Sequence, residues 1–302
     1  MSAPAIYLTG ATASGKSAVA LCLARRVGGE IISVDSMQVY RKLDIGTAKP
    51  SADEQSEVPH HLIDVAGLDE PFDVAQFVRL AKRAEATVQS RGVMPIFCGG
   101  TGLYFRALFD GLGGSPPGDE SLRAELETAP LEALLDELAA KDPAAFESID
   151  RQNQRRIVRA VEVIRLTGQP YSSQRTGWEA PGKVPSNLFC ITREPGDLAK
   201  RIHLRVDSMF ERGLVAETQA LAKCGLRDNR TARQAIGYRQ VLEHLDGGPG
   251  LAETVELVKA RTRQFAKRQR TWFRNQMNCQ PFECLAGESG EACCERLLGM
   301  LG

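Results

Sequence analysis

A phosphate-binding loop is the clearest chemical feature of this sequence. Residues 10–17 read Gly-Ala-Thr-Ala-Ser-Gly-Lys-Ser, which matches the pattern Gly-x-x-x-x-Gly-Lys-Ser/Thr. In such a loop, backbone N–H groups point at phosphate oxygens, the lysine adds a cation and the last hydroxyl is offered to Mg²⁺. We therefore expect a polyphosphate site with Mg²⁺ on Ser17 and phosphate contacts from Gly10, Thr12, Ala13, Ser14, Gly15, Lys16 and Ser17.

Two other positions carry polar side chains directly after apolar runs. Asp35 follows residues 30–34, and Thr101 follows residues 94–98 and two glycines. Three roles are open to Asp35: holding Mg²⁺ beside the phosphate loop, acting as a general base toward an incoming nucleophile, or capping a helix. The glycines before Thr101 permit close backbone approach and leave its hydroxyl as the polar group of that loop.

Arg201 and Arg205 lie one helical turn apart and therefore on the same face of a predicted helix. Guanidinium groups bind phosphate oxygens in a bidentate manner, so the pair suits a phosphate site. The alternative is a solvated helix face that pairs with Glu194 or Asp197, and the spacing by itself favours this second interpretation.

Basic side chains gather in two places. Residues 259–274 hold seven basic residues and no acidic one, with aromatic side chains between them. Cations and rings together are typical of nucleic-acid contacts, although a solvated helix face explains either cluster taken alone. The first cluster contains Lys259, Arg261, Arg263, Lys267, Arg268, Arg270 and Arg274, and the second contains Arg151, Arg155, Arg156 and Arg159.

The elements that must position these residues alternate between strands and helices. Apolar runs over 5–8, 30–34, 94–98 and 188–191 predict buried parallel strands, and residues 18–24 and 74–91 predict helices between them. We expect an α/β fold: a core of the phosphate-loop NTPase type, with a central parallel sheet flanked by helices. Residues 1–109 and 186–302 would form this core, and 110–185 an inserted helical subdomain bounded by turn-forming residues.

Composition places few further limits on function. The 302 residues include 38 basic and 38 acidic side chains, so any nucleic-acid site must come from local clusters. The N-terminus leaves no room for a leader and no apolar run is long enough to span a membrane, which favours a cytoplasmic protein. The eight cysteines include no Cys-x-x-Cys pair, so we interpret those at 279, 284, 293 and 294 as reduced thiols rather than a zinc site.

Seven motifs in order resemble those of the tRNA dimethylallyltransferase family, bacterial type. They occupy residues 10–17, 34–40, 44–50, 59–64, 99–104, 235–239 and 267–274. The resemblance implies transfer of a dimethylallyl group from dimethylallyl diphosphate to N6 of the adenosine at tRNA position 37, which follows the anticodon. Mg²⁺ is the implied cofactor, and the anticodon stem-loop is the implied partner of a monomeric enzyme without an obligate protein partner.

The resemblance also implies roles for individual residues. Asp35 would be the general base, Thr101 and Arg205 would stabilise the departing pyrophosphate, and Arg201 would bind the diphosphate. Gln38 would hydrogen-bond adenine. The implied tRNA contacts are Asp35, Ser36, Met37, Gln38, Thr101, Arg123, Arg155, Arg156, Arg159, Gly237, Tyr238, Arg239, Lys267, Arg268, Arg270, Trp272 and Arg274.

Two departures and three alternatives accompany the resemblance. Ala11 stands where the family usually has proline, and no zinc-finger extension like that of eukaryotic relatives follows. An enzyme that prenylates free adenine nucleotides would share the site residues but not need the basic cluster at 259–274. A small-molecule kinase would use the loop for ATP, and a nucleotide-switched RNA-binding protein would need no base at Asp35.

Overall fold

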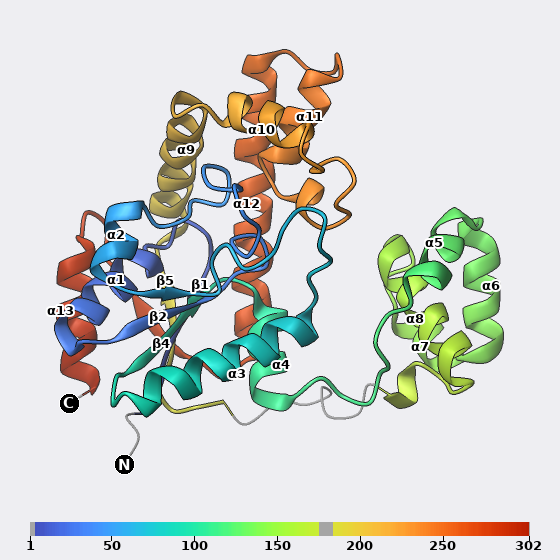
Figure 1. The fold of residues 1–302 in the computed structure, drawn as a ribbon, viewed down its shortest axis with the longest axis horizontal. Coiled ribbons are helices and arrows are strands. Elements are labelled where there is room, and N and C mark those ends of the chain that lie inside the picture. Colours follow the sequence, from blue (N-terminus) through green and yellow to red (C-terminus); the bar gives the residue numbers. More distant parts are fainter. Residues whose placement is uncertain (1–3, 175–183, 302) are drawn as a thin grey trace. The chain divides into compact units, whose positions relative to one another are not determined.

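The computed structural model describes residues 4–174 and 184–301. The chain forms two compact units, one made of Met1–Phe109 with Lys183–Gly302 and the other of Asp110–Gly182 (Figure 1). We call them the core unit and the inserted unit, and each is described by itself.

A six-stranded parallel sheet lies at the centre of the core unit, with strand order β3-β2-β4-β1-β5-β6. Neighbouring strands are held in parallel register, for example Ile6 opposite Ile96 and Tyr7 opposite Leu188. The strands are β1 (Ile6–Gly10), β2 (Glu30–Val34), β3 (His60–His61), β4 (Pro95–Gly99), β5 (Leu188–Thr192) and β6 (Gln280–Glu283).

Helices cover both faces of this sheet, as Figure 1 shows. Helices α1 (Lys16–Val27) and α13 (Gly290–Leu301) pack on one face, where Ile6, Leu8 and Ile96 are buried. The other face carries α3 (Val74–Ser90), α4 (Gly102–Asp110) and α12 (Leu251–Gln276). Aromatic rings fill that layer, since Tyr7 stacks on Phe97 with centroids 4.9 Å apart. Alternate residues of each buried strand therefore supply the two apolar layers.

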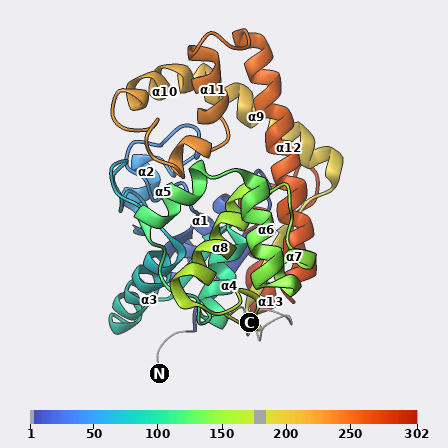
Figure 2. The same cartoon turned by 90° about the vertical axis from the view of Figure 1, so that its right-hand side faces the viewer.

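Helix α2 lies beside α1 (Figure 1), where Arg25 pairs with Glu57. Helices α9, α10 and α11 pack beyond the carboxyl ends of the strands. Helix α9 lies alongside α12 (Figure 2), and α10 packs against α11. Their apolar side chains form one cluster with the loop that follows β2, including Val39, Leu43 and Tyr238. The helices are α2 (Ala52–Glu57), α9 (Pro195–Glu211), α10 (Leu214–Ala222), α11 (Tyr238–Leu245) and the 3-10 turn η2 (Ala232–Gln234).

The inserted unit consists of helices around its own apolar core. Leu126, Leu138 and Val161 lie at its centre and are fully buried. A buried carboxylate adds polar contacts, because Glu162 accepts hydrogen bonds from Arg123 at 2.8 Å and Arg159 at 2.6 Å. The elements are α5 (Glu120–Thr128), α6 (Leu131–Lys141), α7 (Pro143–Ser148), α8 (Gln154–Thr167) and the 3-10 turn η1 (Ser172–Gln174).

The predicted α/β fold is confirmed, with the expected four strands and the helix after residue 73 in place. The sequence analysis missed β3 and β6, which are the short outer strands of the sheet. Gln280–Glu283 contains a proline and has only one buried side chain, so it lacks the apolar run that marked the central strands. Among the described residues, no helix combines the length and apolarity that crossing a membrane requires.

Candidate active site

Four parallel strands end at the same edge of the sheet, and the residues that follow them form the site. Residues 11–15 follow β1, Asp35 follows β2, Thr101 follows β4 and Arg193 follows β5. Because ligands of open α/β sheets bind at the carboxyl ends of strands, this edge is the place to look for chemistry.

The phosphate-binding loop connects β1 to the first turn of α1. A turn closes between Ser14 N and Ala11 O at 3.2 Å, and Lys16 Nζ donates to Ala11 O at 3.3 Å. The Ser14 hydroxyl is buried without a hydrogen-bond partner, which leaves it available to a phosphate oxygen. Ser17 is exposed in the first turn of α1 and offers a hydroxyl of the kind that Mg²⁺ prefers. The loop and helix N-terminus thus fit a diphosphate with its metal.

Asp35 is fixed through one of its two carboxylate oxygens. Its Oδ1 accepts hydrogen bonds from the backbone N–H groups of Met37 at 2.8 Å and Gln38 at 3.2 Å. Within residues 4–174 and 184–301, Oδ2 has no hydrogen-bond partner and can accept a proton. The turn-capping role and the general-base role are therefore compatible, because each uses a different oxygen.

Thr101 connects the ends of β2 and β4. Its hydroxyl oxygen accepts a hydrogen bond from Ser36 N at 3.1 Å, and its backbone N–H donates to Val34 O at 3.3 Å. Since the oxygen already accepts from Ser36, the hydroxyl proton is free to point at a substrate oxygen. The loops that carry Asp35 and Thr101, the two predicted catalytic residues, are therefore hydrogen-bonded to each other.

Two arginines of α9 face the phosphate-binding loop rather than solvent. Arg201 Nε donates to Ala13 O at 3.0 Å. Burial lowers the pKa of Arg205, and the nearby Asp35 carboxylate raises this pKa by a smaller amount. The solvated-face alternative for this pair is therefore wrong, and Asp197 pairs with Arg193 instead, at 3.0 Å.

The electrostatic balance at this edge favours an anion. Burial lowers the pKa of Lys16; nearby Arg205 lowers it further, whereas Asp35 raises it. Arg205 donates no hydrogen bond to any residue that the structure describes. Lys16, Arg201 and Arg205 bring three cations to a space that holds one carboxylate, Asp35. A bound diphosphate would offset this excess of positive charge.

Arg193 is a supporting residue that the sequence analysis missed. The side chain is almost fully buried, and its Nε donates to Ser14 O at 2.7 Å. Its Nη1 donates to Leu285 O at 3.0 Å, which ties the phosphate-binding loop to the chain after β6. Its position directly after β5 is the only signal in the sequence, and such a signal does not distinguish a loop support from a surface arginine.

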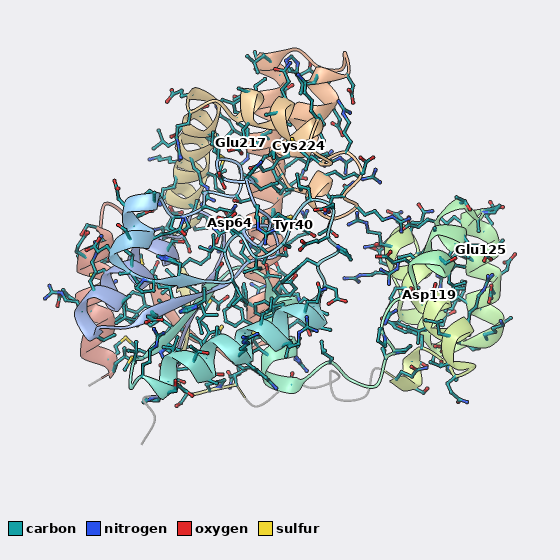
Figure 3. All side chains as sticks on the ribbon, in the orientation of Figure 1. Tyr40, Asp64, Asp119, Glu125, Glu217 and Cys224 are labelled. Carbon is teal, nitrogen blue, oxygen red and sulfur yellow. The ribbon has the colours of Figure 1, made fainter. Side chains whose placement is uncertain are left out.

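Polar side chains from within residues 38–64 hold the loop after β2 in place. Gln38 Nε2 donates to the carbonyls of Thr47 and Ala48, both at 3.2 Å, and its Oε1 accepts from Ser33 at 2.9 Å. Buried Lys49 donates to Tyr40 O at 2.7 Å and to Asp64, two residues labelled in Figure 3. Gln38 thus has an intramolecular role here, and its contact with adenine stays a prediction.

Tyr238 contradicts one expectation, because its side chain is 0% exposed and cannot present a surface to tRNA. Its hydroxyl donates to Glu217 and accepts from the N–H of Gly46 at 3.1 Å. Gly237 is also buried. These residues support the loop after β2 from within, whereas exposed Arg239 pairs with Glu243 at 3.0 Å.

Helix α12 carries the basic cluster at 259–274, and we call its exposed cations near the C-terminal end of the helix the basic stripe. The side chains of Lys267, Arg268, Arg270 and Arg274 are exposed, while Trp272 is half-buried. Trp272 makes an edge contact with Phe273, at a centroid distance of 5.1 Å. The stripe is therefore accessible to a polyanion, and its binding to tRNA stays a prediction.

In the inserted unit, the predicted tRNA contacts divide into two groups. Arg123 and Arg159 are held by Glu162, and Arg159 also donates to Pro116 O. Arg155 and Arg156 are exposed on the first turn of α8. The first two cations are partly neutralised by a buried carboxylate, and the binding of any of the four to tRNA stays a prediction.

The C-terminal cysteines contribute one group of potential metal ligands among the described residues. The ligand atoms of Cys284, Glu288 and Cys293 lie within 4.8 Å of one another. Arg296 donates to both oxygens of Glu288, at 2.7 and 2.8 Å, and so occupies the carboxylate. This arrangement fits an ion pair beside two thiols, and we assign no metal to it.

Comparisons with known proteins show the family of this chain. The IPP transferase family model matches residues 38–276. A tRNA dimethylallyltransferase 1 of Trichlorobacter lovleyi is 47% identical, over 90% of each chain.

Solved structures extend the similarity to the fold. A tRNA isopentenylpyrophosphate transferase of Bacillus halodurans is 40% identical, covers 98% of this chain and 95% of its own, and has a TM-score of 0.70. A eukaryotic dimethylallyltransferase acting on tRNA is 27% identical, covers 94% and 74%, and has a TM-score of 0.77. The chain belongs to the IPP transferase family.

Proposed function

We propose that this chain transfers the dimethylallyl group of dimethylallyl diphosphate to N6 of adenosine 37 in tRNA, releasing pyrophosphate. Membership of the IPP transferase family supports the reaction class. The observation that carries the assignment is the meeting of a carboxylate with a cationic phosphate cradle: Asp35 lies beside Lys16 and Arg205 at the ends of different strands. A phosphate site alone would need no such base.

The reaction substitutes nitrogen for oxygen at an allylic carbon. A bond forms between N6 of adenine and C1 of the dimethylallyl group, and the bond between C1 and the diphosphate oxygen breaks. The exocyclic amine is a weak nucleophile because its lone pair is delocalised into the ring. Asp35 Oδ2 accepts the N6 proton as the new bond forms, while backbone N–H groups hold Oδ1 in place.

The leaving group is stabilised from several directions. The N–H groups of the phosphate-binding loop and the helix N-terminus bind the pyrophosphate, whose negative charge grows in the transition state. Lys16, Arg201 and Arg205 add cations, and the Thr101 hydroxyl can donate to the departing oxygen. Mg²⁺ on Ser17 would supply further charge neutralisation of the diphosphate.

The target base must leave its stack before it can reach Asp35. Flipping a base costs a few kcal/mol, which contacts with the rest of the anticodon arm must offset. We assign that grip to the exposed cations of α12 and to Arg155 and Arg156 of the inserted unit.

A labelling experiment tests the assignment. Purified protein, Mg²⁺ and dimethylallyl diphosphate labelled in the prenyl group are mixed with an unmodified tRNA that has A37, the same tRNA with G37, or AMP. We expect label only in the A37 tRNA. Label in AMP but not in tRNA would assign the chain to free-nucleotide prenylation, and label in neither would overturn the proposal.

A further inference from the structure

The side chain of Gln269 reaches from α12 into the active-site edge of the sheet. Its Oε1 accepts a hydrogen bond from Thr12 N at 2.8 Å, and its Nε2 donates to Gly100 O at 2.9 Å. The residue is 8% exposed and belongs to none of the groups assigned above. One amide thus bridges the phosphate-binding loop and the residue before Thr101.

The neighbouring backbone is shaped to admit this amide. A Cβ atom on Gly100 would lie 2.5 Å from Gln269 Nε2, so a larger residue at 100 would displace the bridge. One turn further, the ring of Trp272 covers Gly102, where a Cβ atom would lie 2.2 Å from the ring. Phe273 packs against Phe105 of α4, with ring centroids 6.3 Å apart. The buried face of α12 is therefore fitted to the loop that carries Thr101.

We propose that Gln269 is a positioning residue that sets the distance between the diphosphate cradle and the Thr101 hydroxyl. This inference rests on the proposed function, because Thr101 acts there on the departing pyrophosphate. The same helix carries the exposed cations Lys267, Arg268 and Arg270. Helix α12 thus contacts the diphosphate cradle through the Gln269 amide and also carries the cations that we assign to tRNA.

The geometry explains why an amide is needed at this position. The bridge requires an acceptor toward Thr12 N and a donor toward Gly100 O, separated by one planar group, and glutamine supplies both. A leucine would leave the half-buried N–H of Thr12 and the buried carbonyl of Gly100 without these partners. The two loops would then move relative to each other, and small misplacements of reacting groups can lower rates about 100-fold.

A double-mutant cycle tests the proposal through single-turnover rates at saturating substrates. We expect Gln269→Leu to lower the rate about 10- to 100-fold. Because Gln269 acts through Thr101, the variant Thr101→Ala with Gln269→Leu should be no slower than Thr101→Ala by more than about twofold. Multiplied losses in the double variant would overturn the proposal.

Two further measurements separate positioning from general destabilisation. Thr254→Val serves as the matched control, since Thr254 is a buried polar residue of α12 whose hydroxyl donates, among the described residues, only to the carbonyls of Pro249 and Gly250. It should keep the wild-type rate; if both variants lose the same activity, Gln269 has no special role. Affinity for tRNA should stay within about twofold, because the exposed cations remain, and a loss as large as that in rate would overturn the proposal.

If Gln269→Leu does not fold, Gln269→Met replaces it, because methionine fills a similar space without the hydrogen bonds. We expect the same loss of rate and use the same double-mutant cycle. If wild-type protein transfers no label to tRNA, the proposed function fails. If it does and Gln269→Leu is as fast as wild type, only the present inference fails.

Discussion

At the scale of single residues, the site divides its work between atoms of the same side chain. Asp35 uses Oδ1 to hold the turn at Met37 and Gln38 and keeps Oδ2 for chemistry. Thr101 accepts a hydrogen bond from Ser36 and keeps its proton for the substrate. Each group is thereby oriented before the substrate binds, so little reorganisation is needed during the reaction.

Asp35→Asn tests whether the two carboxylate oxygens of Asp35 have separate roles. The amide oxygen can still accept from Met37 and Gln38, so the turn should persist, but asparagine cannot take the N6 proton. We expect kcat to fall by about 10²- to 10⁴-fold. Affinity for tRNA, measured by filter binding, should change less than about twofold. A variant that loses tRNA affinity but keeps its single-turnover rate would assign Asp35 to positioning instead.

The Thr101 hydroxyl can be tested with a pair of substitutions. Thr101→Ser retains the oxygen that Ser36 N contacts and the proton for the leaving group, whereas Thr101→Ala removes both. We expect serine to stay within about fivefold of wild type and alanine to lose about 10- to 10³-fold in kcat, the range for removing one oxyanion-type donor. Equal rates for both variants would refute a role for the hydroxyl.

At the scale of elements, helix α12 combines buried residues that pack on the active-site loops with exposed cations. Ala266, Gln269 and Phe273 are buried, and Lys267, Arg270 and Arg274 are exposed. The spacing of three and four residues between the buried positions is that of one helical face. The number of cations in this segment could be read from the sequence, whereas the packing of Trp272 against Gly102 could not. The predicted contact of Trp272 with tRNA stays a prediction.

The exposed face of α12 predicts a salt-dependent grip on tRNA. We expect Arg270→Ala with Arg274→Ala to weaken binding and to reduce the slope of log Kd against log salt by about one unit for each lost phosphate contact. Arg26→Ala is the matched control, since Arg26 is an exposed arginine at the end of α1 that pairs with Glu295. An unchanged slope in the double variant would mean that the stripe is only a solvated face.

At the scale of the whole molecule, the chain contains two units that each bury a core of their own. The core unit holds every residue of the phosphate-binding loop and its partners, and the inserted unit is organised around α8 and Glu162. Burial by itself raises the pKa of Glu162, but the hydrogen bonds from Arg123 and Arg159 outweigh it and lower the pKa below 4.5.

This carboxylate gives the inserted unit a predictable response to pH. A lowered pKa stabilises the fold above the ordinary carboxyl value, and the stabilisation is lost as the pH falls through the lower folded value. Glu162→Gln should cost about 1–2 kcal/mol near neutral pH, because two half-buried arginines lose their charged partner and a buried carboxylate is replaced. It should also flatten the acid limb of the unfolding curve, measured by circular dichroism.

Binding of pyrophosphate provides the control for that variant. The contacts of the phosphate-binding loop lie in the core unit, so pyrophosphate affinity measured by calorimetry should be unchanged in Glu162→Gln. A loss of affinity together with stability would show that the two units fold as one.

The sequence by itself determined the parts of this protein whose physics is local. The phosphate-binding loop between 10 and 17 follows a buried strand and opens a helix, and the central strands are continuous apolar runs, so both could be predicted from neighbouring residues. The positions of Asp35 and Thr101 after strands likewise predicted their place at one edge of the sheet.

Only the tertiary structure decided which distant side chains meet. Arg201 could equally have faced solvent, the sequence around Arg193 and Gln269 did not show which loops they support, and Tyr238 was predicted to contact tRNA although it is buried. Partners such as Thr12 and Gln269 are 257 positions apart, and their meeting depends on how the sheet and its helices pack. The energy of such contacts arises only once water is excluded from the whole assembly, and neighbouring residues do not encode it.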